Sequence, residues 1–133
     1  MPLKKSLRDQ RGQTVTEFAL VLPLLMLVLL AIMQFGVLFR DYLAVVDAVR
    51  AGARVGVVSR TSTSPTPKEK CEQAVKKAAT DLGVANNLVV TCTSSWASGA
   101  DLKVVATYPY DIDLLGKVIK SGRFTSQTTE RVE

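Results

Sequence analysis

Glu17 is the residue with the clearest potential for chemistry, because it lies immediately before a long uncharged segment. From Phe18 to Phe39 the sequence has 22 residues without a charge, and Gln34 is the one strongly polar residue among them. A carboxylate costs on the order of 2.5–3.5 kcal/mol at the centre of a bilayer and less near its interface. This acid therefore needs an explanation, unless its side chain simply faces water.

A cut between Gly12 and Gln13 supplies one explanation. The new amino group on Gln13 would be positively charged, and Glu17 would become the fifth residue of the shortened chain. When such helices pack side by side, the amine of one can meet the carboxylate of its neighbour and fix their axial register. The glycine–glutamate spacing alone is a weak pattern. Joined to a short basic leader and an immediate apolar helix, it is a strong one.

Other kinds of chemistry find little support in the sequence. The 133 residues include no histidine and only two cysteines, so the commonest general base is missing and a four-thiolate zinc site is excluded. Glycine-rich phosphate loops, nucleophile elbows and HExxH motifs are absent. Asp111 and Asp113 could suggest paired acids or a calcium site, but without further clustered oxygen ligands they favour a helix N-terminal cap. We expect no enzyme, no cofactor and no metal.

The positive charge is concentrated ahead of the apolar segment. Residues 1–12 contribute a net +3 of the formal +5, from Lys4, Lys5, Arg8 and Arg11 against Asp9. Such a cluster is what the positive-inside rule predicts for a short cytoplasmic segment. The later basic residues are scattered among acids and do not form a phosphate-binding patch. The sequence therefore predicts a membrane protein with a cytoplasmic N-terminus, and no binding of nucleic acid.

The apolar segment has the length of a membrane span. At about 1.5 Å per residue it would cover about 33 Å as a helix, and it is apolar on every side. A cleaved secretory signal has a shorter apolar region and a small-residue cleavage site after it, whereas the nearest A-x-A motif is at residues 51–53. An uncut single-pass anchor and a prepilin-type signal, cut before the apolar segment, both remain open. Pro23 is expected to kink the helix.

The N-terminal third of the sequence resembles TadE-like proteins, the minor pilins or pseudopilins of tight-adherence (Tad, or Flp) type IV pili. The similarity lies in RGQTVTEFALVLPLLMLVLLAIMQFGVLF and continues into DYLAVVDAVRAGARVGVV; the C-terminal FTSQTTERVE is also similar to the closing strand of such proteins. The resemblance implies that Gly12 precedes the scissile bond and that Gln13 is the mature N-terminus. It also implies that Glu17 is the acid at position five. Phe18 and Pro23 agree with the aromatic residue and the kinking proline of such pilins.

The partners that the resemblance implies are a prepilin peptidase, other pilins and the assembly-platform proteins of the Tad system. The protein would then be a structural subunit in the inner (cytoplasmic) membrane, with an extracytoplasmic C-terminal domain, and could enter an extracellular pilus. The alternative is a single-pass surface binding module with an uncut anchor, and N-terminal processing separates the two.

The periodicity of the sequence predicts an α+β fold of the type IV pilin kind. A basic leader (1–12) precedes one long helix (about 14–58, with the membrane span at about 18–39), whose second half presents an apolar stripe of Leu43, Val46, Val49 and Ala53. The Ala/Gly/Arg stretch around Arg50 and Arg54 is expected to be a solvated face. A polar linker (59–67) and a small extracytoplasmic domain (68–133) follow.

The predicted domain lays the long helix against a small three-stranded antiparallel sheet. An amphipathic helix over residues 68–83 is capped by Thr66, has Pro67 at its first position and is stopped by Gly83. Strands are expected at 88–93 and 102–108, with a loop at 94–100 between them, and at 124–132. Residues 111–120 are predicted to form a short helix, because Ile112, Leu115, Val118 and Ile119 are at helical spacing.

The two cysteines, Cys71 and Cys92, would form a disulfide in an extracytoplasmic domain, worth about 3 kcal/mol by loop entropy. In a reducing compartment they would instead be two buried thiols. Trp96, in the loop between two strands, is either an exposed contact residue or a lid folded back onto the core.

Overall fold

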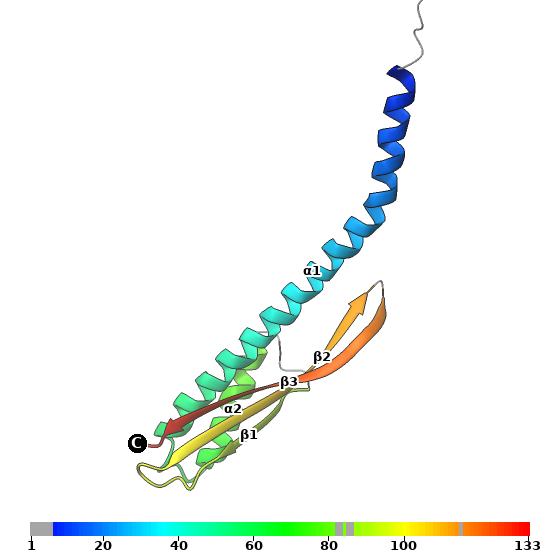
Figure 1. Ribbon diagram of the computed structural model, residues 1–133. Coiled ribbons are helices and arrows are strands. Elements are labelled where there is room, and N and C mark those ends of the chain that lie inside the picture. The colour runs from blue at the N-terminus through cyan, green and yellow to red at the C-terminus, as the bar shows by residue number, and fades with distance from the viewer. Residues whose placement is uncertain (1–6, 82–83, 85–86, 115) are drawn as a thin grey trace, which may run out of the picture. The chain divides into compact units, whose positions relative to one another are not determined.

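The computed structural model describes residues 7–81, 84, 87–114 and 116–133. The elements are α1 (Leu7–Val58), α2 (Pro67–Asp81), β1 (Val89–Thr93), β2 (Asp101–Leu114) and β3 (Lys117–Arg131) (Figure 1). The chain divides into an N-terminal unit, Met1–Gly36, and a C-terminal unit, Val37–Glu133, which includes the second part of α1. The α+β fold predicted from the sequence, with a long helix, a second helix and a three-stranded antiparallel sheet, is confirmed.

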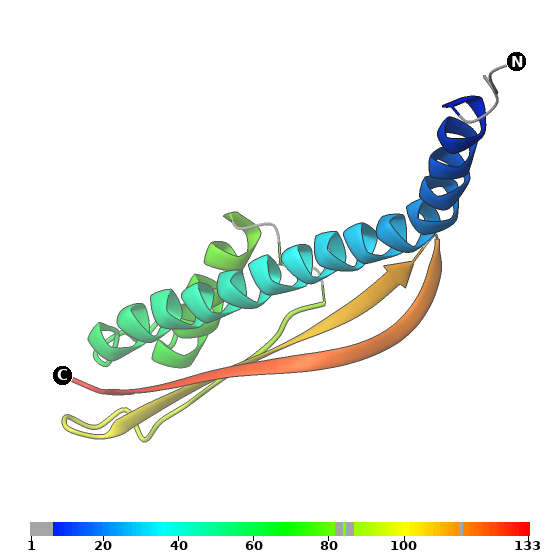
Figure 2. The same cartoon turned by 45° about the horizontal axis from the view of Figure 1, so that its top comes forward.

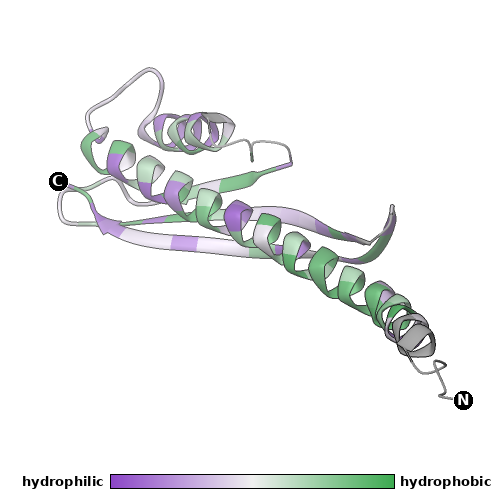
Figure 3. Cartoon of the chain, turned by 90° about the horizontal axis from the view of Figure 1, so that it is seen from above, coloured by the Kyte–Doolittle hydropathy of each residue, from purple (hydrophilic) through white to green (hydrophobic). Residues whose placement is uncertain are grey.

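The described part of the N-terminal unit is helical, and it is uncharged from Phe18 onward. The helix begins at Leu7, earlier than the predicted Thr14, because Gly12 alone does not interrupt it. Its apolar side chains are exposed on every side, among them Leu20, Leu25 and Leu29. In Figure 3 the ribbon of this part of α1 is mostly green, the colour of hydrophobic residues. By length and composition α1 is able to cross a membrane. Pro23 lies inside the helix, where a span tolerates the missing backbone N–H.

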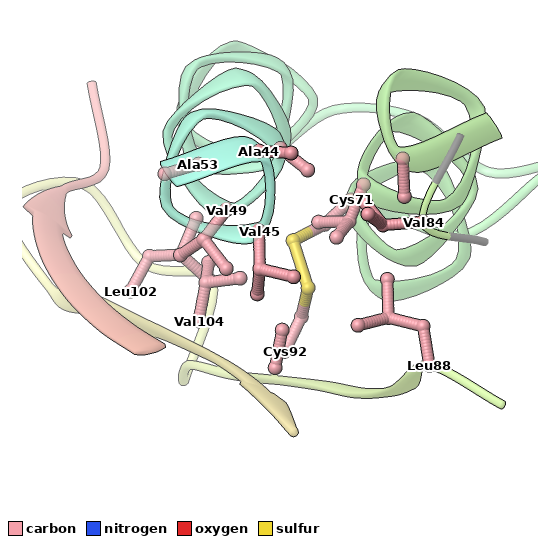
Figure 4. Close-up of a cluster of buried hydrophobic side chains, with 14 of the residues drawn as sticks. Ala44, Val45, Val49, Ala53, Cys71, Val84, Leu88, Cys92, Leu102 and Val104 are labelled. Carbon is pink, nitrogen blue, oxygen red and sulfur yellow. A yellow bond between two sulfur atoms is a disulfide. The ribbon is translucent and has the colours of Figure 1, made fainter. Parts of the chain in front are cut away.

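The C-terminal unit is built around one apolar core to which α1, α2 and the sheet all contribute. Figure 4 shows Val45 and Val49 pointing from α1 toward the sheet, with Leu102 and Val104 of β2 opposite them. The remaining core residues are mostly small: Ala44, Ala48, Ala53, Cys71, Val75, Ala79, Val84, Leu88, Cys92, Ala106 and Val132. Small residues let the elements approach closely, so the core of a unit of this size is thin but densely filled.

The buried face of α1 is the small-residue face. Val49 and Ala53 of the predicted stripe are buried, but Leu43 is 46% exposed, so the stripe was partly wrong. A Cβ at Gly52 would collide with the Val75 side chain and lie 3.1 Å from the Cys71 carbonyl oxygen of α2. The glycine therefore permits the close approach of α1 and α2. Side-chain size, rather than hydropathy, determines which face of α1 is buried.

Helix α2 begins with a capping box. The Thr66 backbone N–H donates to Glu69 Oε2 over 2.8 Å, and the Glu69 N–H donates to Thr66 Oγ1 over 3.3 Å. These bonds satisfy donors that the first turn leaves free. Pro67 is the first helical residue, so the predicted N-terminus is confirmed. The predicted stop at Gly83 lies outside the described residues.

Thr66→Ala is expected to lower the free energy of unfolding by about 1 kcal/mol, because the Glu69 N–H loses its acceptor. Thr80→Ala is the matched control, since Thr80 lies within α2, is exposed, and donates to the Lys76 carbonyl.

The hydrogen bonds from the Thr66 backbone N–H, and then from its side chain, lower the pKa of Glu69. The benefit of the Glu69 charge is therefore present above the ordinary carboxyl pKa and is lost as the pH falls through the lowered value. Urea unfolding of Glu69→Gln at several pH values measures this loss, and a difference from wild type that does not shrink in acid would contradict it.

The sheet has the order β1-β2-β3, and both pairs are antiparallel (Figure 2). The strand predicted over 88–93 is found as β1 and the closing strand as the second half of β3. The short helix predicted over 111–120 is wrong. The described residues there form the ends of β2 and β3, and the chain turns back at Gly116, whose φ is 78°. A left-handed φ favours glycine, which makes this residue suited to the turn.

Candidate assembly and cleavage site

The residues of the predicted cleavage site lie on the exposed first turns of α1. Gln13 Nε2 donates to Glu17 Oε1 over 3.1 Å, one helical turn further on, and both residues are exposed. Thr16 Oγ1 donates to the Gly12 carbonyl oxygen over 2.9 Å. The structure therefore brings Gln13 and Glu17 together within one chain before any cut, while the carbonyl that a peptidase would attack is held inside a helix.

Gly12 has open space around it. A Cβ built at this position would meet nothing within 4 Å. Glycine in a helix interior costs roughly 0.5–1 kcal/mol relative to alanine, so it weakens the helix at this position. A peptidase that needs an extended substrate would have less helix stability to overcome at this peptide bond than with alanine there.

Phe18 and Pro23 lie further along the same helix. Phe18 is 61% exposed and Pro23 is exposed too, so both belong to the apolar surface that lipid or another helix can cover. The geometry suits lateral contact, since a carboxylate at the start of an apolar helix can pair with a cation of a neighbouring molecule or with the amino group of a new terminus. None of the side chains described here, from residue 12 to Pro23, pairs a nucleophile with an activating base.

The acidic pair predicted to cap a helix does not do so. Asp111 and Asp113 are exposed side chains on β2, and the helix that they were expected to start is absent. Among the described residues, no group of three or more histidine, cysteine or acidic side chains is placed to hold a metal ion.

The disulfide predicted between Cys71 and Cys92 is present. It joins α2 to β1 through the core, with a Cα–Cα distance of 6.4 Å across 21 positions of sequence (Figure 4). A loop of this length gives a stabilisation of about 3 kcal/mol in the chain-entropy account. The bond holds α2 against the sheet in a unit whose core has few large side chains.

Two expectations about individual side chains are settled by burial. Trp96 is partly buried and packs against the core, as a lid rather than as an exposed contact residue. Arg50 and Arg54 are exposed, as expected of a solvated face. The ion pair between Arg50 and Asp47 spans 3.7 Å with both side chains 65% exposed, so it contributes little.

An aromatic cluster at one end of the C-terminal unit was missed. The Phe124 ring of β3 lies 5.5 Å from Tyr42 of α1 and 5.3 and 5.7 Å from Tyr108 and Tyr110 of β2, between ring centroids. Burial, and then the Asp41 carboxylate, raises the pKa of Tyr108. The signal in the sequence was the alternation Tyr-Pro-Tyr, which puts two tyrosines on one face of a strand. The cluster attaches α1 to the sheet near the point where α1 enters the unit.

Comparison with known proteins finds a family match that lies entirely within α1. The TadE-like protein family model matches residues 12–54, which run from the predicted cleavage site to the second arginine of the Ala/Gly/Arg stretch. No curated protein and no solved structure matches the chain. The matched residues make up about a third of the sequence and lie within the N-terminal segment that carries the resemblance; the C-terminal FTSQTTERVE lies outside the match. The resemblance is thus confirmed for this segment: residues 12–54 match the TadE-like protein family.

Proposed function

We propose that this protein is a structural subunit, a minor pilin or pseudopilin, of a Tad-type pilus. Residues 18–39 of α1 cross the inner membrane with the N-terminus in the cytoplasm and the C-terminal unit outside. A prepilin peptidase cuts between Gly12 and Gln13, and the shortened chain assembles with other pilins on the Tad platform through its apolar helix. The protein performs no reaction of its own.

The observation that carries this proposal is the segment matched to the TadE-like family. The match begins at Gly12 and contains Glu17 at the start of a helix whose apolar surface is exposed on every side. A plain anchor gains nothing from a carboxylate at this point. In a subunit that packs beside others, the carboxylate can fix the axial register of neighbouring helices, because an ion pair in lipid is strong only where both charges meet.

The disulfide supports the proposed orientation. Disulfides persist in oxidising compartments and are rare in the cytosol. The bond between Cys71 and Cys92 lies in the C-terminal unit, and the basic residues lie ahead of α1's apolar segment. Both features favour an extracytoplasmic C-terminal unit.

The test is mass spectrometry of the protein isolated from membranes of cells that have the Tad system. We expect a mature chain that begins at Gln13. Gly12→Leu is expected to accumulate as the full-length precursor, because the peptidase loses its small residue while the space around Gly12 accommodates the side chain. Gly36→Leu is the control, since a Cβ at Gly36 also meets nothing within 4 Å. A functional chain that begins at Met1, or one cut after residue 39, would leave only a membrane-anchored binding module.

A further inference from the structure

The linker between α1 and α2, residues 59–66, is rich in hydroxyl groups. Six of its eight residues are serine or threonine, and the other two are Arg60 and Pro65. None of the eight belongs to a helix or a strand. Segments rich in serine and threonine that also contain proline are typical of O-glycosylated regions of extracellular proteins. The hydroxyl groups of this linker fall into two sets, which differ in their hydrogen bonds.

Three of the hydroxyl groups hold the linker in its conformation. Ser59 is buried, and its Oγ donates to the Val55 carbonyl oxygen of α1. Ser62 Oγ donates to the Pro65 carbonyl oxygen over 2.7 Å. Thr66 Oγ1 accepts the hydrogen bond that caps α2. A substituent on Ser59 or Ser62 would remove the donated proton, and one on Thr66 would crowd the cap, so these three oxygens are unsuited to modification.

The other three hydroxyl groups belong to Thr61, Thr63 and Ser64, and all three side chains are exposed. Within the part of the chain that the structure describes, none of these three hydroxyls makes a hydrogen bond. A substituent on them therefore breaks no bond that supports the fold. The backbone around them is irregular, so an enzyme can bind it in an active-site cleft without opening a helix or a strand.

The linker lies on the same side of the membrane as the disulfide. Residues 67–70 separate it from Cys71, and three of these four residues are charged, so no membrane span lies between. The disulfide favours an oxidising compartment outside the cytosol. ATP and the kinases that use it are cytosolic, which argues against phosphate on these hydroxyls. Sugars are carried across membranes on lipids, so a sugar is the modification that fits this location.

We propose that Thr61, Thr63 and Ser64 are O-glycosylation sites, and that the donor is a lipid-linked sugar diphosphate. The hydroxyl oxygen attacks the anomeric carbon of the sugar and forms a new C–O bond, while the bond from that carbon to the diphosphate breaks. The diphosphate leaves on its lipid with the bonding electron pair, and the hydroxyl proton passes to a base of the transferase. The inference goes beyond the proposed pilus function and rests only on the orientation proposed there for the C-terminal unit.

A sugar at this position would protect the linker from proteases. Arg60 is exposed and directly precedes Thr61, and exposed irregular segments are preferred sites of proteolysis. Because Cys71 and Cys92 both follow the linker, the disulfide would not hold the two pieces together after a cut. The three sites therefore lie on the single covalent connection between α1 and the rest of the C-terminal unit.

The test is mass spectrometry of the protein isolated from membranes of the cells that naturally produce it. Thiols are alkylated before reduction, so that the state of the disulfide is measured in the same sample. Trypsin, which cuts after lysine and arginine, separates residues 61–68 from residues 55–60, which contain Ser59. We expect residues 61–68 to be heavier by one or more whole sugars, and electron-transfer fragmentation to place them at positions 61, 63 and 64. Alkali should remove them by β-elimination, and residues 55–60 should have their unmodified mass.

The triple variant Thr61→Ala/Thr63→Ala/Ser64→Ala is expected to lose the sugar completely while it keeps the disulfide. Its folded form should also be cut by trypsin after Arg60 faster than the wild-type protein. Ser62→Ala is the matched control, because it removes a hydroxyl from the same linker, one that already donates to Pro65. This variant should keep the sugar.

An unmodified peptide 61–68 in a protein whose disulfide is intact would overturn the glycosylation and leave the proposed function untouched. The mass increment of a phosphate would do the same, as would sugars that remain on Ser62 or Thr66 in the triple variant. Thiols found free at Cys71 and Cys92 would instead overturn the proposed orientation, and the glycosylation with it. The cut after Gly12 is read separately, from the N-terminal peptide of the same digest.

Discussion

Replacing Gly52 by valine will lower the melting temperature of the C-terminal unit by roughly 10–20 °C, the shift that about 3 kcal/mol gives in a unit of this size. A Cβ at Gly52 would collide with the Val75 side chain and lie 3.1 Å from the carbonyl oxygen of Cys71. The Val75 side chain is β-branched and has one strongly preferred χ1 rotamer in a helix, so it cannot rotate out of the way. The added side chain must therefore force α1 and α2 apart.

The measurement is thermal unfolding of the full chain in detergent, followed by the fluorescence of Trp96. Trp96 is the single tryptophan of the chain, and it packs against the core that would open. Gly36→Val is the matched control, because the same substitution is made in the same helix where nothing lies within 4 Å. If both variants melt together with wild type, the close approach of α1 and α2 does not require glycine.

Gly52 also shows what the sequence could and could not predict about α1. Its length and amphipathic continuation followed from the spacing of apolar residues, since periodicity reports which side of a helix avoids water. The buried face was misjudged because hydropathy ranks Leu43 above Ala44, whereas the packing of α2 requires small side chains. Only the Ala/Gly content of residues 48–53 carried that information, and the sequence did not show that the helix predicted over 68–83 packs against this face.

The error at residues 111–120 has a different origin. Ile112, Val118 and Ile119 fit a helical period over a short segment, but short apolar patterns do not separate helix from strand. Pro109 seemed to end the strand, because proline cannot donate within a central strand. β1 has already ended at that level, so β2 is an edge strand there and no strand on its open side requires a backbone N–H from Pro109. On its other side, Pro109 lies opposite Arg123 of β3. Where a neighbouring strand ends is a property of the fold and cannot be read locally.

The candidate site was more accessible to sequence reasoning than the sheet. Gly12, Gln13, Glu17 and Phe18 follow one another on a single helix, so their order alone places them together. Cys71 and Cys92 were paired because the chain has no other cysteine. The aromatic cluster around Phe124 joins α1, β2 and β3, and contacts between distant segments of this kind leave only a weak trace in the sequence.

Glu17→Gln will insert into the membrane and be cut normally, but its association with other pilins will fall by more than about a hundred-fold. After the cut, the amino group of Gln13 must enter an apolar environment when helices pack together. An unpaired charge left there costs about 3–5 kcal/mol, which corresponds to this loss of affinity. Glutamine keeps an acceptor for Gln13 Nε2, so the helix of the precursor, with its 3.1 Å hydrogen bond, is preserved. The loss therefore reports the charge and not the fold.

Glu17→Asp is the matched control, since it keeps the charge on a shorter stem and should retain part of the assembly. Co-purification of pilins from detergent-solubilised membranes measures association. An apolar carbodiimide provides a second measurement, because it joins a carboxylate directly to an amine that touches it. In wild-type assemblies we expect an amide link between Glu17 of one copy and the Gln13 amine of a neighbouring pilin subunit, and no such link in Glu17→Gln. Full assembly of the glutamine variant would mean that the carboxylate only faces water at the end of the span, and that another feature of α1 sets the register of the subunits.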